Sequence, residues 1–219
     1  MAKRVILISG LGANEKAFSK IGKLPYHKIF VKWLPSNSND SLEDYAKRLI
    51  LYYEISGEDV LVGLSFGGLL CQCIASMLKN RIVILLSSFR TSNDLNAFFK
   101  FSLKMGLHKL MPSMRVPLID LVVARILNGG NNESTPVLNA MLKDTDYNLM
   151  KWSLQAIADS KTYFLPKSKV FSFIGKKDFI VSQWGGENVK YLIDGSHFMV
   201  FDKGSFITKE INEILNQNG

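Results

Sequence analysis

Short apolar runs recur near both ends of the chain and are nearly continuous rather than alternating. They cover residues 3–8, 28–34, 60–64, 81–87, 169–174 and 189–193. Runs of this length, rich in Val, Ile and Leu, are typical of parallel strands that are covered on both faces. The pattern therefore predicts a sheet of about six strands.

Polar and apolar residues at helical spacing fill the stretches between these runs. Helices are predicted over 41–54, 66–79 and 203–216. Ser41 followed three residues later by Asp44 is a weak form of the capping box, which marks a helix start. Strands that alternate with helices predict an α/β fold with a mostly parallel sheet, right-handed crossovers and helices on both faces.

The alternation stops between the fourth and fifth predicted strands. This stretch predicts helices only, over 93–110, 117–127, 136–143 and 146–157. We expect 1–87 and 167–219 to form the α/β core, and 88–166 to form a helical lid or cap inserted at the carboxyl edge of the sheet. Ligands bind at that edge in open α/β folds.

Composition is ordinary for a soluble globular protein and suggests one domain of 219 residues with an insertion. The formal net charge of +8 would permit attraction to anionic substrates, carrier proteins or membrane surfaces, although it also serves solubility. No nucleic-acid-binding motif accompanies it. A small-molecule substrate is therefore favoured over a nucleic-acid partner.

The first residues of the chain and its two cysteines indicate the cellular compartment. Residues 1–4 lead directly into the first strand, which is too short for a signal sequence, and no apolar run reaches membrane-spanning length. Cys71 and Cys73 lie two apart on one predicted helix and face different ways, so we expect reduced thiols. We expect a cytoplasmic protein without stable membrane insertion.

A serine stands between the third predicted strand and its helix. It is the centre of Gly63-Leu64-Ser65-Phe66-Gly67, a G-x-S-x-G pattern. Serine at the tip of such a strand-to-helix turn sits in strained backbone, and its neighbours two residues away must be small for the turn to close. The pattern predicts that Ser65 is a nucleophile.

A serine hydroxyl needs a base, and the base needs a carboxylate. His197 follows the last predicted strand, and Asp178 follows the fifth, so both belong to loops at the carboxyl edge. We expect them to be base and acid. The alternatives are His27 and His108 for the base, and Asp94, Asp144 or Asp146 for the acid.

An oxyanion needs two N–H donors. The Phe66 N–H starts the helix after Ser65, and the Leu11 N–H lies between Gly10 and Gly12 in the loop after the first strand. Glycines there let the backbone approach a ligand closely. We expect Phe66 and Leu11 to form the oxyanion hole.

Together these motifs resemble the α/β-hydrolase superfamily. Ser65, Asp178 and His197 occur in its order of nucleophile, acid and base, and the chain is similar to the small cytosolic serine hydrolases with a helical lid. It departs from the family pattern in lacking the amino-terminal strands. It also carries Ser9 where a histidine often stands, and has only 18 residues between acid and base.

The resemblance implies a serine hydrolase that cleaves a carboxylic ester or thioester through an acyl-enzyme, without a metal or an organic cofactor. A lyase or acyltransferase that uses the same triad, and a non-catalytic small-molecule-binding protein, remain open. The inserted segment is rich in flexible and aromatic apolar residues and in cations, and could line an acyl pocket with a cationic mouth. These residues are Phe98, Phe99, Phe101, Met105, Leu107, Leu110, Met111 and Met114, with Lys100, Lys104, Lys109 and Arg115.

Overall fold

The structure is a computed structural model of the whole chain. It describes residues 3–37, 39–110, 112, 116–131, 133–163, 165 and 167–218. Two of the residues expected to line an acyl pocket, Met111 and Met114, and the cation Arg115, lie outside the described residues.

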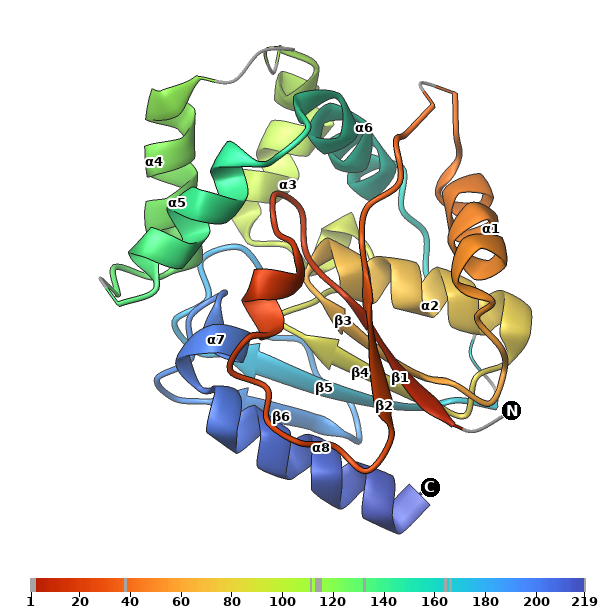
Figure 1. Cartoon of the computed structure of the whole chain (residues 1–219). Helices are drawn as coiled ribbons and strands as arrows, with labels where there is room; N and C mark the ends of the chain where they lie inside the picture. Colours follow the sequence, from red (N-terminus) through yellow and green to blue (C-terminus); the bar gives the residue numbers. More distant parts are fainter. Residues whose placement is uncertain are drawn as a thin grey trace.

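A six-stranded parallel sheet forms the centre of the molecule (Figure 1). The strands are β1 Arg4–Ile8, β2 His27–Val31, β3 Val60–Leu64, β4 Ile82–Leu86, β5 Lys169–Gly175 and β6 Val189–Leu192. Their order is β2-β1-β3-β4-β5-β6, and every neighbouring pair is parallel. The prediction of a six-stranded sheet is confirmed, and the sheet is parallel throughout.

Helices cover both faces of this sheet, as predicted. Side chains of β1 alternate between the two faces, because successive residues of a strand point to opposite sides. Ile6 and Ile8 pack in the cluster that contains α1 (Leu42–Tyr53) and α2 (Phe66–Leu78), whereas Val5 and Leu7 pack in the cluster that contains α8 (Gly204–Asn218). The sheet is therefore buried on both sides, which explains why its strands are apolar runs.

The local signals for helix starts are confirmed at α1. Ser41 Oγ accepts a hydrogen bond from the Asp44 N–H at 3.1 Å, which satisfies one of the free donors at the helix start. Two short elements escaped prediction, the 3₁₀ helix η1 Glu15–Phe18 and the helix α7 Met199–Asp202. Each is a single turn, too short to show a period in the sequence.

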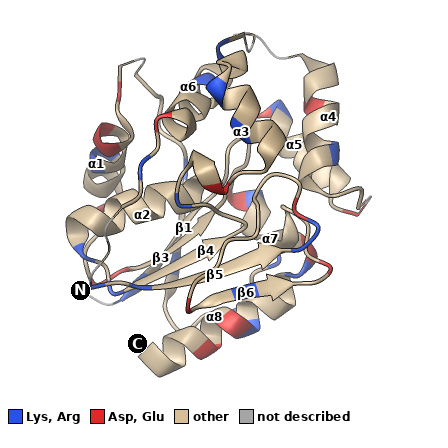
Figure 2. Ribbon diagram, turned by 180° about the vertical axis from the view of Figure 1, so that it is seen from behind, with Lys and Arg blue, Asp and Glu red and all other residues tan. Residues whose placement is uncertain are grey.

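The described residues between β4 and β5 form helices and no sheet strand. They are η2 Ser92–Asp94, α3 Ala97–Lys104, η3 Leu107–Leu110, α4 Pro117–Leu127, α5 Thr135–Lys143 and α6 Tyr147–Ala158. Figures 1 and 2 both show α3 to α6 gathered at one end of the molecule, away from the two termini. The division of the chain at 88 and 166 stays a prediction.

One predicted helix in this stretch, over 93–110, is wrong as a single element. Leu95 adopts an extended conformation and pairs with Val181 in an isolated antiparallel bridge. Gly106, which lies between the end of α3 and the start of η3, has a φ of +70°. The apolar spacing is helical across the whole stretch, but the backbone is interrupted at both points.

Among the helices of the described residues, none is both long enough and apolar enough to span a bilayer.

Candidate active site

Ser65 occupies a sharp turn between β3 and α2. Its φ of 51° and ψ of −120° lie in a region that non-glycine residues rarely adopt, and it is preceded and followed by regular structure. A Cβ atom on Gly63 would lie 2.4 Å from the Gly68 Cα, and one on Gly67 would lie 2.2 Å from the Ile8 carbonyl oxygen. Only glycine fits at these two positions, which is the physical reason for the G-x-S-x-G spacing.

The structure brings the predicted base and acid to this serine. Ser65 Oγ lies 2.9 Å from His197 Nε2, and His197 Nδ1 lies 2.8 Å from Asp178 Oδ2. His197 is 3% exposed. The three side chains, which are far apart in the sequence, form one continuous chain of hydrogen bonds.

Asp178 is held in position by the backbone. Its Oδ1 accepts hydrogen bonds from the N–H groups of Ile180 at 2.8 Å and Val181 at 2.9 Å. An ionised carboxylate only accepts hydrogen bonds, so His197 Nδ1 carries the proton in this pairing. His197 Nε2 is then left with its lone pair directed at the Ser65 hydroxyl.

Two glycines bring the acid and base loops together. A Cβ atom on Gly175 would lie 2.1 Å from the Gly195 carbonyl oxygen, and the Lys177 N–H donates to that same oxygen at 2.9 Å. Residues 176–188, all of which the structure describes, form no helix. Because β5 and β6 are neighbours, the 18 residues between Asp178 and His197 suffice.

The loop after β1 lies against the serine. A Cβ atom on Gly10 would be 3.1 Å from the Ser65 Cβ. The loop is a tight turn, because the Ala13 N–H donates to the Gly10 carbonyl at 3.1 Å and Gly12 has a φ of +71°. Ser9 Oγ donates to the Ala13 carbonyl at 2.9 Å, so the residue that departs from the family pattern stabilises this turn.

The two predicted oxyanion donors flank Ser65. Phe66 is the first residue of α2, and the first N–H groups of a helix have no partner inside it. Leu11 is the second residue of the tight turn that contacts Ser65. Their assignment to an oxyanion hole stays a prediction.

The alternative acids lie elsewhere. Asp94 makes two hydrogen bonds with the Arg90 guanidinium, both at 2.8 Å. Burial raises the pKa of Asp94, but its hydrogen bonds with Arg90 outweigh burial and hold that pKa below its usual range. Asp144 pairs with Lys16, and Asp146 caps α6. None of these hydrogen bonds involves His197.

The alternative histidines also lie away from the serine. His27 is exposed at the start of β2. His108 Nε2 lies 2.9 Å from Gln155 Oε1, and Gln155 Nε2 donates to Asp159. His108 is thus part of a polar contact between η3 and α6.

A cavity of about 210 Å³ adjoins the turn after β1. Leu11 and Gly12 form one of its walls, Trp33 and Leu34 a second, and α5 and α6 the third. The remaining lining residues are Ala13, Asn14, Pro35, Met141, Asp144, Thr145, Asp146, Leu149, Met150 and Ser153. Sequence reasoning missed Trp33, Met141 and Met150, because no local pattern connects residues this far apart.

The residues expected to line an acyl pocket mostly do not. Phe98, Phe101, Met105, Leu107 and Leu110 are exposed. Only Phe99 among the described members of that set packs against the core. The expectation failed because the apolar side chains of this stretch lie on two sides of a helix, and only one side is covered.

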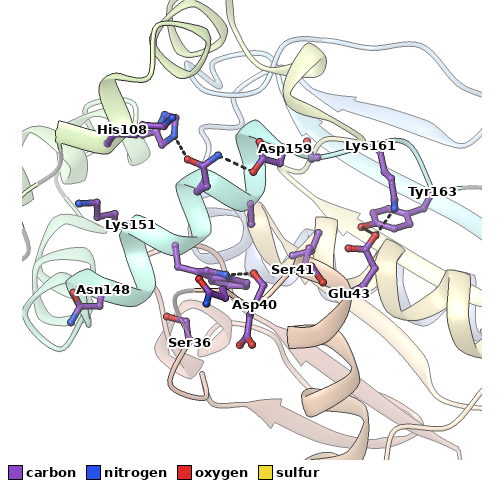
Figure 3. Close-up of a pocket in the computed structure, with 17 residues that line it drawn as sticks. Ser36, Asp40, Ser41, Glu43, His108, Asn148, Lys151, Asp159, Lys161 and Tyr163 are labelled. Carbon is purple, nitrogen blue, oxygen red and sulfur yellow. Dashed lines mark hydrogen bonds and ion pairs between the residues drawn. The ribbon is translucent and has the colours of Figure 1, made fainter.

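A larger cavity, about 700 Å³, lies on the other side of α6, and Ser65 is not among the residues that line it (Figure 3). Trp152 borders it and donates its Nε1–H to the Asp40 carbonyl at 2.8 Å. Glu43, at one end of the cavity in Figure 3, pairs with Lys161 at 2.7 Å. None of Ser65, Asp178 and His197 lines this cavity.

Metal-ligand groupings were examined on the part of the chain that the structure describes. It contains no group of three or more His, Cys, Asp or Glu side chains arranged to hold a metal ion. Cys71 and Cys73 are free and buried, as expected, and burial raises the pKa of the Cys73 thiol to about 11.

Comparison with known proteins gives a fold but no close relative. No protein-family model matches the chain, and no curated protein is significantly similar in sequence. The structure is similar to that of a hydrolase from Oleispira antarctica, with a TM-score of 0.79 and 15% identity over 100% of this chain and 92% of that one. It is also similar to a thermophilic esterase from Thermogutta terrifontis, with a TM-score of 0.76 and 15% identity over 99% and 90%.

A third similar structure is a putative non-heme bromoperoxidase from Mycobacterium tuberculosis H37Rv. Its TM-score is 0.74 and its identity 16%, over 100% of this chain and 94% of that one. At such identities the likeness concerns the fold. The parallel sheet, its helical layers and these neighbours together show that the chain has the α/β-hydrolase fold.

Proposed function

We propose that this protein is a serine hydrolase that cleaves a carboxylic ester or a thioester through an acyl-enzyme. The observation that carries the proposal is the hydrogen-bond chain from Ser65 Oγ through His197 to Asp178, with distances of 2.9 and 2.8 Å. The strained backbone of Ser65 supports it, because strain at a serine between a strand and a helix is typical of a nucleophile elbow.

The reaction has two halves. In the first, Ser65 Oγ attacks the carbonyl carbon while His197 Nε2 takes the hydroxyl proton. The tetrahedral oxyanion is stabilised by the N–H groups of Phe66 and Leu11, and its collapse expels the alcohol or thiol, which receives the proton from His197. In the second, His197 deprotonates a water molecule that attacks the acyl-enzyme, and the released Ser65 regains its proton.

Asp178 stabilises the imidazolium that forms twice in each cycle. It lies against the Nδ1 side of His197 and is itself held by two backbone N–H groups. It therefore keeps the ring oriented with Nε2 toward Ser65 without taking part in proton transfer.

The acyl group fits the cavity beside the turn after β1. This cavity begins at Leu11, next to the Gly10 that contacts Ser65, and its volume of about 210 Å³ lies below the roughly 300–1,000 Å³ of pockets for drug-sized ligands. We therefore expect a preference for short acyl chains.

Residues 88–166 would act as the lid of this cavity. Gly12 supports this role, because a Cβ atom there would lie 3.0 Å from Leu142 Cδ2 and 3.3 Å from Met150 Cε. The two helices α5 and α6 thus contact the turn that would hold the oxyanion.

The test is turnover of a p-nitrophenyl ester series together with fluorophosphonate labelling followed by intact mass. Ser65→Ala should lower kcat by at least about 10⁴-fold and remove the label, because no other group can form the acyl-enzyme. Ser205→Ala, a change at an exposed serine of α8, is the matched control and should keep both the wild-type turnover and the fluorophosphonate label.

Several outcomes would contradict the proposal. Wild-type turnover by Ser65→Ala would rule out Ser65 as the nucleophile. Labelling of Ser65 without turnover of any ester or thioester would favour an acyltransferase or lyase that uses the same serine. Stoichiometric ligand binding with no label would favour a non-catalytic binding protein.

A further inference from the structure

Exposed apolar side chains concentrate on one part of the described chain. Of the 13 large hydrophobic residues that are exposed there, eight belong to α3, η3 and α4 or lie between them. They are Phe98, Phe101, Met105, Leu107, Leu110, Leu118, Leu121 and Val122, which we call the apolar face. Monomeric proteins rarely leave such a concentration of apolar side chains in water.

Within α3 the apolar face follows helical spacing. Phe98 and Phe101 of α3 and Met105, the C-cap of that helix, recur at three and four residues and are 69%, 61% and 60% exposed. On the opposite side of the same helix, Phe99 and Leu103 pack against the core. The helix is therefore apolar on both sides, and the protein itself covers only one.

Charge on the same helices has a single sign at the surface. Residues 97–127 contain five cations and one acid, which supplies half of the formal net charge of +8. The acid, Asp120, is buried, whereas Lys100, Lys104, Lys109 and Arg125 are exposed. Elsewhere cations and acids are mixed, as on α8.

We propose that the apolar face and its four exposed cations bind the surface of an anionic lipid bilayer. A helix with apolar residues beside lysine and arginine binds at the boundary between headgroups and acyl chains, because apolar burial and attraction to anionic lipids add together. A second copy of this chain is the poorer occupant, since two faces that carry only positive charge repel each other.

The bound orientation follows from the position of these helices. They lie at the end of the molecule beyond the carboxyl ends of the strands, where Ser65 and His197 also lie. The carbonyl of Leu127, the last residue of α4, accepts a hydrogen bond from the Phe198 N–H at 3.0 Å. Helix α4, which carries part of the apolar face, is therefore hydrogen-bonded to the residue that follows His197.

The experiment is co-sedimentation of the full chain with vesicles of phosphatidylcholine alone and of phosphatidylcholine with 30% phosphatidylglycerol. The protein should sediment with the anionic vesicles and stay in solution with the neutral ones. Binding should weaken when salt rises from 0.1 to 1 M, because the Debye length falls from about 10 to about 3 Å.

Two triple variants separate the charged and apolar contributions. Lys100→Gln/Lys104→Gln/Arg125→Gln should lower the partition coefficient about 100-fold, since each cation near an anionic surface contributes about fivefold. Phe101→Ser/Leu118→Ser/Leu121→Ser should also lower it about 100-fold, because each change removes an apolar side chain from the interface. All six residues are exposed, so far-UV circular dichroism and thermal unfolding should be unchanged.

Matched controls make the same changes elsewhere. Lys23→Gln/Lys32→Gln/Lys209→Gln removes the same charge from exposed positions outside the face. The three serine substitutions of Leu51, Tyr52 and Phe206 remove exposed apolar side chains from α1 and α8. Both controls should bind anionic vesicles within about twofold of the wild-type protein.

The proposal is overturned if the folded protein does not bind anionic vesicles. It is also overturned if the control variants lose as much binding as the two triple variants of the apolar face and its cations. Loss through the cations but not through the apolar residues would mean electrostatic adsorption without insertion, and would also overturn it. A dimer that the serine variants dissociate would assign the face to a second copy. A monomer that does not bind vesicles would leave an acidic protein as the occupant. None of these measurements depends on catalytic activity.

Discussion

Two regions of this chain use apolar side chains in opposite ways. Every residue of β3, Val60–Leu64, is buried, and so are the first ten residues of α2. In α3 and η3, by contrast, four large apolar side chains are exposed, and so is Met105 between them. Both regions contain large apolar side chains, so the presence of such side chains does not by itself tell whether a segment is covered.

The difference lies in the number of neighbours that each region meets. Strand β3 pairs with β1 on one side and β4 on the other, and its two faces are covered by helices. Helix α3 touches the protein along one side only. Close packing around Ser65 fixes one geometry, whereas the outer helices keep apolar area that another surface can cover.

The largest expected effect comes from adding one methyl group to the tightly packed buried region. In Gly63→Ala the new Cβ would meet the Gly68 Cα at 2.4 Å, and backbone atoms cannot move aside. We expect a loss of more than about 3 kcal/mol in the free energy of unfolding, measured by urea denaturation.

Gly185→Ala is the matched control for that change. A Cβ atom on Gly185 meets nothing within 4 Å, so stability should change by less than about 0.5 kcal/mol. If both variants unfold at the same urea concentration, tight packing at the elbow is not what fixes Ser65.

A second comparison tests whether α5 belongs with the buried region. Leu138 on α5 is 1% exposed and packs in the core, whereas Leu118 on α4 is 69% exposed. Leu138→Ala should cost about 2–5 kcal/mol and Leu118→Ala less than about 0.5 kcal/mol. Equal costs in denaturant titrations would mean that the two helices are covered alike.

Acid stability tests a buried charge pair at the opposite end of the sheet. Asp59 is 2% exposed and pairs with Arg4 at 2.6 Å. Burial raises the pKa of Asp59, but its hydrogen bonds with Arg4 and Ser56 outweigh burial and leave that pKa below the usual value. A lowered folded-state pKa gives stability above about pH 3.9, the unfolded value, and that stability is lost as pH falls through the folded pKa.

Asp59→Asn should therefore destabilise the protein by about 1–3 kcal/mol at pH 7 and by progressively less below pH 4. Thermal unfolding across this pH range measures the effect. Glu213→Gln, which breaks a 3.8 Å pair on the surface of α8, is the control and should leave the pH profile unchanged. A cost for Asp59→Asn that is constant from pH 7 to pH 3 would contradict this account.

The smallest effect is expected at the contact between α6 and α1. Trp152 of α6 lies 4.5 Å from Tyr45 of α1 between ring centroids, and its Nε1–H donates to the Asp40 carbonyl. Trp152→Phe keeps an aromatic ring and loses that hydrogen bond, so we expect a cost of about 1 kcal/mol in chemical denaturation. No cost would mean that water replaces the lost donor.

Local patterns in the sequence predicted most of the core. Buried parallel strands are apolar because both of their faces are covered, so nearly every residue of the run is apolar. The G-x-S-x-G pattern predicted the turn at Ser65, although only the constraint on Gly63 is local and the constraint on Gly67 comes from β1. The position of His197 and Asp178 after the last two strands predicted their shared edge, since parallel strands end on the same side.

Only the tertiary structure decided how these parts meet. The contact between Gly175 and Gly195 that joins the acid and base loops is between backbones, and no side-chain pattern reports it. The cavity next to Leu11 is formed by residues from four separate segments. Helical spacing between 93 and 110 predicted apolar faces but not which face is covered, because coverage depends on segments that are distant in the sequence.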